Sequence, residues 1–201
     1  MGVAYDKKLV HDGYRAYDWF AHCLHQSCLS HLLARCKRML LSARGNARRF
    51  AGRVKALLKE ALALRDGRRA GLLTVQETAF ASLDIERRMR ELVSRPKKDP
   101  ENRRLAKHLS KLLGMGQLFL FLREDDTDAT NHKAEQAIRP AVVNRKVWGG
   151  NRTWEGAAAQ SVLMSILRTA AQRGRDVLST LSRMLCQPCP HLRPALLLDS
   201  S

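Results

Sequence analysis

Apolar residues at a helical period are the feature that most constrains how this chain folds. In the stretch CLSHLLARCKRMLLSA, Leu29, Leu32, Leu33, Cys36 and Leu40 recur three or four residues apart, with basic residues between them. That spacing predicts a helix with one apolar face. The same reasoning predicts further helices over about 48–64, 75–94, 102–123, 130–139, 156–172 and 176–185. Thr130 is a candidate N-cap, Pro140 should end or kink its helix, and the segment 143–156 is expected to be a loop.

Only the start of the chain predicts a strand. KKLVHDG is a short apolar run closed by Asp-Gly, which is typical of a strand ending in a turn. A lone strand would be marginal. Either this strand is unimportant, or its partner strands lie upstream in a longer parent protein. We therefore expect a mainly α chain with only one or two short strands near the N-terminus.

The charge balance indicates a polyanionic partner. The chain has 36 Lys and Arg against 19 Asp and Glu, a formal net charge of +17. Nucleic acid is the first candidate for this partner. Cations distributed over a protein displace the counterions of a row of phosphates, and the release of these counterions favours binding. An anionic membrane surface is the alternative, and the predicted helix over 102–123 comes nearest to a basic amphipathic helix. No apolar run approaches the roughly 20 residues that cross a bilayer, so a membrane protein is not expected.

The expected location is the cytoplasm. The start MGVAYDKKLVHDG has no apolar h-region and no small-residue cleavage site. The cysteines number five, an odd count, and without an export signal we expect them to be reduced thiols.

Two carboxylates are candidates for metal chemistry. Asp12 lies at the C-terminal end of the predicted strand, the edge where ligands gather in open α/β folds. Glu135 lies on a helix that could pack against that strand. Converging there, they would suit Mg²⁺, which takes oxygen ligands. The plain alternatives are a turn-forming Asp before Gly and a solvated surface carboxylate.

Two groups of cysteine and histidine are candidates for zinc sites. Cys23, His25, Cys28 and His31 are close in sequence, and Cys28 and His31 could supply one ligand pair from a helix. Residues 186–191, CQPCPH, look like half a site. A packing cluster and a disordered tail are the alternatives, and zinc is not expected.

Two blocks of the sequence resemble one protein family. LVHDGYRAYDWF followed by HQSCLSHLLARCKRM forms the first, and TNHKAEQAIRPAVVNRKVWGGNRTWEGAAAQSVLMSILRTAAQRGRDVL forms the second. Together they resemble the C-terminal half of the insertion-sequence-66 family transposases, from about Leu9 to Leu185. The second block is more specific, because it pairs the N-x-x-A-E-x-A-I-R-P run with a downstream Arg-Lys, a glycine turn and a closing helical pair.

The resemblance implies a catalytic domain of RNase H-like fold with an Asp-Asp-Glu triad. It matches Asp12 to the second acidic residue and Glu135 to the third, which would hold Mg²⁺ or Mn²⁺ for cleavage and transfer of insertion-sequence DNA. Cys28 and His31 match a C-x-x-H signature of such transposases. The implied layout is a remnant of the RNase H-like core over 1–41, a helical insertion over 42–125, catalytic helices over 126–186 and a tail over 187–201.

The resemblance also suggests contacts to DNA close behind Glu135. The candidates for phosphate contacts are Arg139, Arg145, Lys146 and Arg152, and Trp148 and Trp154 could stack on an unpaired base. Solvated charges and buried tryptophans are the alternatives.

No residue of the chain matches the first Asp of the triad. Only eleven residues precede Asp12, and Asp6 lacks both the distance and the strand context. We therefore expect a truncated, nucleoid-associated transposase that is inactive alone, so whether the chain is an enzyme stays open. A homo-oligomer or a complementing transposase chain would be its partner. The alternative is a non-enzymatic helical DNA-binding remnant that pairs with or inhibits an intact transposase.

Overall fold

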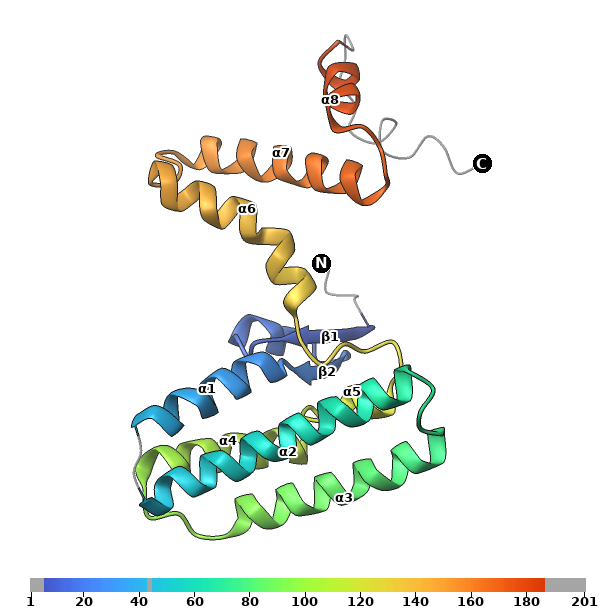
Figure 1. Cartoon of the computed structure of the whole chain (residues 1–201). Helices are drawn as coiled ribbons and strands as arrows, with labels where there is room; N and C mark the ends of the chain where they lie inside the picture. Colours follow the sequence, from blue (N-terminus) through green and yellow to red (C-terminus); the bar gives the residue numbers. More distant parts are fainter. Residues whose placement is uncertain (1–5, 43–44, 187–201) are drawn as a thin grey trace. The chain divides into compact units, whose positions relative to one another are not determined.

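A computed structural model describes residues 6–42 and 45–186 of the chain (Figure 1). It is mainly α with two short strands, as predicted. The chain divides into two compact units, residues 1–132 and 133–201. In chain order the elements are β1 (Lys8–His11), the 3-10 helix η1 (Arg15–Trp19), β2 (Leu24–Ser27), α1 (Leu29–Ser42), α2 (Gly45–Arg69), α3 (Val75–Ser94), α4 (Pro100–Gly114), α5 (Leu120–Arg123), α6 (His132–Trp148), α7 (Trp154–Gln172) and α8 (Val177–Leu185).

The two strands form a parallel sheet in the first unit. β1 pairs with β2 in a register that sets Leu9 opposite His25 and His11 opposite Ser27. The sequence predicts β1 but not β2, because the segment LHQS has no apolar alternation. The far edge of β2 is covered by a later part of the chain, where the amide of Ser27 donates to the carbonyl of Gln117 over 2.8 Å.

A four-helix bundle, α1 to α4, carries the main core of this unit (Figure 1). α2 packs against α1 on one side and α3 on the other, and α3 also packs against α4. The most buried side chains of this core include Leu29, Leu58, Ile85, Met89, Leu105, Leu109 and Phe119. Thr74 and Glu77 form a capping box that begins α3, and Asp99 caps α4 just before Pro100. Local signals therefore fix where α3 and α4 begin.

Two helix ends in the first unit differ from the prediction. α2 runs through Gly67 to Arg69, and the turn follows at Gly71, whose φ of 72° suits glycine. The helix predicted over 102–123 is two helices. α4 ends at Gly114, and Gly116, with a φ of 69°, turns the chain before α5. The apolar run LGMGQLFLFL made this segment look like the continuation of one helix, so the sequence did not predict the break.

The second unit consists of α6, α7 and α8. Thr153 and Asp176 cap α7 and α8 through side-chain bonds to the amides of Gly156 and Ser179. α6 begins at His132, one residue later than a Thr130 cap requires, and runs through Pro140 to Trp148. Of the two outcomes predicted for Pro140, the helix does not end there but bends (Figure 1), and the prediction that residues 143–148 form a loop is wrong. Proline lacks an amide hydrogen and crowds the preceding turn, and Figure 1 shows α6 bent along its length.

None of the helices in the described ranges is both long and apolar enough to span a membrane.

Candidate functional site

The end of β1 presents the carboxylate of Asp12. The strand ends at His11, and Asp12 follows as an exposed residue, so the predicted position at the C-terminal end of a strand is correct. Its Oδ1 accepts the amide hydrogen of Tyr14 over 2.9 Å. Gly13 between them has a φ of 93°, a conformation that L side chains rarely adopt. This turn orients the Asp12 carboxylate before any ligand binds.

Two histidines form a hydrogen-bonded pair beneath that turn. The amide of Gly13 donates to His11 Nδ1 over 3.1 Å, so the proton of this ring lies on Nε2. His11 Nε2 then donates to His25 Nδ1 over 3.0 Å, and His25 Nε2 donates to the carbonyl of Phe20 over 2.9 Å. In this arrangement each ring donates through Nε2 and accepts through Nδ1.

The surroundings of His11 favour its neutral form. Burial lowers the pKa of His11 and the neighbouring His25 lowers it further, whereas Asp12 and Asp18 act against that decrease. No pattern in the sequence marks His11 as a site residue. Its pairing with His25 depends on the parallel register of two strands, one of which local sequence did not predict.

Cys28 joins the end of the sheet to a distant segment. Its side chain is fully buried just before α1, and its Sγ lies 2.9 Å from Ser30 Oγ and 2.9 Å from Asn131 Oδ1. The amide of Asn131 also donates to this Sγ over 3.4 Å. Burial raises the pKa of the Cys28 thiol, but hydrogen bonds from Ser30 and His31 outweigh it, and the net pKa is lowered. The thiol is therefore a hydrogen-bonding centre.

Backbone bonds reinforce this junction. The amide of Cys28 donates to the carbonyl of His11 over 2.8 Å, and the amide of Leu29 donates to the carbonyl of Ala129 over 2.9 Å. The residue before Asp12, the start of α1 and the segment 129–131 therefore meet at one edge of the sheet. α6 begins directly after Asn131, at His132.

The other predicted site residues lie in the second unit. Glu135 is in the first turn of α6, and Arg145 and Lys146 are in its last turn, where cations suit the helix dipole. The remaining candidates, Arg139, Trp148, Arg152 and Trp154, are also exposed. Burial of the two tryptophans was the alternative to stacking on a base. It is wrong, since the side chain of Trp148 is 62% exposed and that of Trp154 is 90% exposed.

Some of the zinc candidates lie in the part of the chain that the structure describes, and others lie outside it. Within the ranges that the structure describes, no three His, Cys, Asp or Glu side chains gather in a way that could hold a metal ion. Cys28 bonds to Ser30 and Asn131, and His31 lies exposed in the first turn of α1. Cys189 and His191 of the tail lie outside the described residues.

Comparison with known proteins gave one match. A protein-family model described as "Transposase IS66 family" matches residues 2–159. Neither the curated proteins nor the solved structures yielded a match. The matched range includes all of the first unit that the structure describes, together with Glu135 and α6.

Proposed function

The chain belongs to the IS66 family of transposases, and from this premise we propose that Asp12 and Glu135 bind a divalent cation for DNA strand cleavage and transfer. The observation that carries the proposal is the family match, which covers both carboxylates. Within the first unit, the junction at Cys28 ties the residue before Asp12 and the residue before α6 to the same cysteine. The family resemblance matches Asp12 and Glu135 to two residues of one acidic triad, which supports a shared site.

The donor set suits magnesium or manganese. Both side chains are carboxylates, and hard divalent cations prefer oxygen ligands. Among the described residues, Asp12 forms no ion pair that would compete for a cation. Bound there, the metal would activate water or a 3′-hydroxyl and stabilise the leaving oxygen.

The protein's own residues would orient the carboxylates and the DNA. The amide of Tyr14 fixes the Asp12 carboxylate, and the neutral His11 holds the amide of Gly13 beside it. Arg139, Arg145, Lys146 and Arg152 would contact phosphates, and Trp148 would stack on a base. We propose that the protein acts in this way on DNA of the nucleoid.

We also propose that the first unit contains part of an RNase H-like core. The parallel β1–β2 pair, with Asp12 at its C-terminal edge, agrees with part of such a core, and α2 to α4 would be the insertion between Asp12 and Glu135. The family resemblance assigns no residue of this sequence to the first Asp. We therefore propose that strand transfer needs an acidic group from another polypeptide segment.

Binding of Mn²⁺ to the ¹⁵N-labelled chain tests the shared site without requiring catalysis. Paramagnetic Mn²⁺ should broaden the amide signals around Asp12 and around Glu135 at the same concentration. Asp12→Asn alone, and Glu135→Gln alone, should each abolish broadening at both places. If the two regions respond independently, or only one responds, the carboxylates do not share a cation and the proposal fails. Glu155→Gln, which changes an exposed glutamate of α7, is the matched control.

A second candidate function is DNA binding without catalysis, in which the chain pairs with or inhibits an intact transposase. The formal net charge of +17 favours it, because charge alone supports binding to DNA. Metal-dependent nicking of a supercoiled plasmid separates the two functions. Nicking that both carboxylate substitutions abolish supports the enzyme, and nicking that survives their combination indicates a contaminating nuclease.

A further inference from the structure

Two long stretches of the first unit contain no acidic residue. The sequence has no Asp or Glu between Asp18 and Glu60, and none between Glu101 and Glu124. α1 and the first half of α2 lie in one stretch, and nearly all of α4 lies in the other. Six cations from these helices form what we call the α1 cation cluster: Arg35, Lys37, Arg38, Lys55, Lys59 and Lys111.

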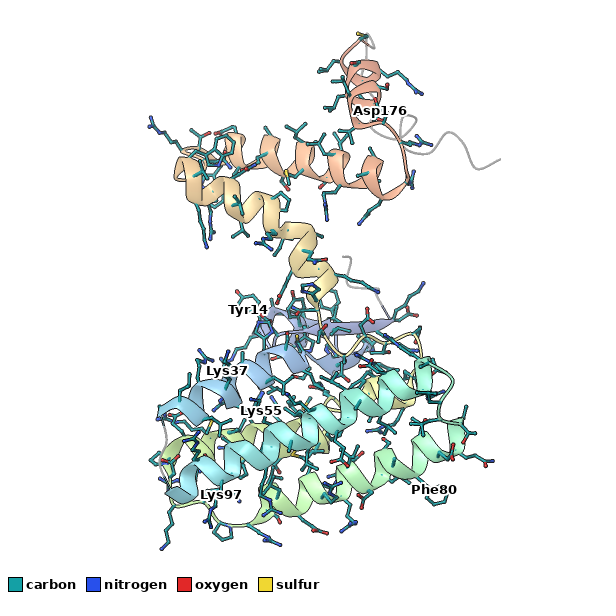
Figure 2. The ribbon with its side chains drawn as sticks, viewed as in Figure 1. Tyr14, Lys37, Lys55, Phe80, Lys97 and Asp176 are labelled. Carbon is teal, nitrogen blue, oxygen red and sulfur yellow. The ribbon has the colours of Figure 1, made fainter. Side chains whose placement is uncertain are left out.

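Members of the cluster on α1, α2 and α4 lie close to buried groups of α1 and α4. Burial raises the pKa of the Cys36 thiol to about 11, and the charges of Arg35 and Lys55 act against that rise. Burial also lowers the pKa of His108 on α4, and Arg35 and Lys111 lower it further. Lys55 on α2 is therefore close to Cys36 on α1, and Arg35 on α1 is close to His108 on α4. Figure 2 shows Lys37 on α1 and Lys55 on the adjacent α2.

The arginines of α3 are already neutralised. On α3, Arg87 pairs with Asp84 over 2.6 Å and with Glu91 over 2.5 Å. Arg88 and Arg90 pair with glutamates, each over 2.6 Å. By contrast, no cation of the α1 cation cluster forms an ion pair with any described residue. Among the described residues, α1 therefore offers more unpaired positive charge to a polyanion than α3 does.

We propose that the α1 cation cluster binds the phosphate backbone of DNA. Cations that form no ion pair are free to replace the counterions of DNA, because no acid of the protein is paired with them. α1 begins at Leu29, beside the junction that holds the residue before Asp12. Arg35 to Arg38 lie about 9–14 Å further along the helix, so DNA that follows α1 would extend toward Asp12.

The composition of this surface favours DNA over a membrane. A helix that binds at a bilayer surface presents an apolar face beside its basic face. The apolar face of α1, with Leu29, Leu32 and Cys36, is buried in the core of the unit. Among the described residues of α1, α2 and α4, Leu41 is the one large apolar side chain that is strongly exposed.

The inference extends beyond the proposed metal site and is tested without metal. In EDTA, binding of the full chain to a random-sequence 25-base-pair duplex is measured by fluorescence anisotropy across a range of KCl concentrations. The cluster variant combines Lys37→Gln, Arg38→Gln and Lys55→Gln. The control combines Arg87→Gln, Arg88→Gln and Arg90→Gln, which removes the same net charge from ion-paired positions. Circular dichroism checks that both variants keep their helices.

We expect the cluster variant to bind DNA at least tenfold more weakly near 100 mM salt. The slope of log affinity against log salt should decrease by about 2–3, since each lost phosphate contact contributes about 0.9. The control should lose less than about 1 in slope. Equal losses in both variants would mean that net charge alone drives binding and would overturn the proposal.

Anionic vesicles of phosphatidylglycerol and phosphatidylcholine provide the second arm. If the cluster variant loses vesicle binding but keeps its affinity for DNA, the surface is a membrane-binding one and the DNA proposal is wrong. The DNA-binding measurement is independent of Mn²⁺ binding and of nicking. If the carboxylate site failed its test, the result for the α1 cation cluster would therefore still be valid. If the cluster failed its test, the result for the carboxylate site would still be valid.

Discussion

Replacing Cys28 with alanine should detach the segment that leads into α6 from the edge of the sheet. The substitution removes the Sγ contacts to Asn131 Oδ1 at 2.9 Å and to the Asn131 amide at 3.4 Å. A neutral hydrogen bond contributes about 1 kcal/mol net, and the longer one contributes less. The missing sulfur atom also leaves a small cavity at a fully buried position, which costs about 1 kcal/mol. The local opening free energy should fall by about 2–3 kcal/mol.

Native-state hydrogen exchange measures this change at the right place. The amides of Leu29, which donates to Ala129, and of Asn131 report on the junction directly. A loss of about 2 kcal/mol corresponds to roughly thirtyfold faster exchange when reclosing is much faster than the chemical exchange step. Cys28→Ser, whose hydroxyl can accept and donate, should recover part of the protection.

Cys36→Ala is the matched control. Cys36 is also fully buried on α1, but it lies in the middle of the bundle core, away from Asn131. The Cys36→Ala substitution should lower the free energy of unfolding of the whole unit, because it removes packing contacts. It should increase the exchange rate of the Asn131 amide much less than Cys28→Ala does. Unchanged exchange at Leu29 and Asn131 in Cys28→Ala would refute the junction, as would an equal effect of both alanine variants.

Two further predictions concern the first unit. Gln26→Leu should lower the free energy of unfolding by about 2–4 kcal/mol in urea denaturation, because it leaves the buried carbonyl of Leu118 and amide of Phe121 without their partner. A loss below about 0.5 kcal/mol would contradict that role. Burial and nearby cations lower the pKa of His108, so the unfolded chain binds a proton more readily and stability should fall as the pH drops below 6.5. Urea denaturation at pH 7.5 and 5.5 should show a smaller loss for His108→Gln than for the original chain.

The helices were predictable where the apolar period and the capping residues agree. α3 follows its predicted limits, because Thr74 and Glu77 begin it and Pro96 follows its end. Prediction failed where tertiary contacts override local preference. β2 places Gln26 in the interior, where its side chain bonds to the chain around Leu118, and no local pattern marks such a strand.

The candidate site was predictable residue by residue but not as an arrangement. Asp12 was identified from a strand followed by Asp-Gly, a local signal. The contact between Cys28 and Asn131 joins residues 103 positions apart, and sequence spacing contains no trace of it. The His11–His25 pair likewise depends on the register of the sheet.

The covering of β2 by residues 117–121 has a consequence for the order of folding. Ser27 and Gln26 find their partners about ninety residues later in the chain. Closing so long a loop adds little to the equilibrium cost, since each doubling of loop length costs only about 0.6 kcal/mol. Its effect is on timing. During synthesis from the N-terminus, α1, α2 and α3 are complete before residue 117 exists, so β2, which is made before them, is among the last parts of the unit to complete its hydrogen bonds.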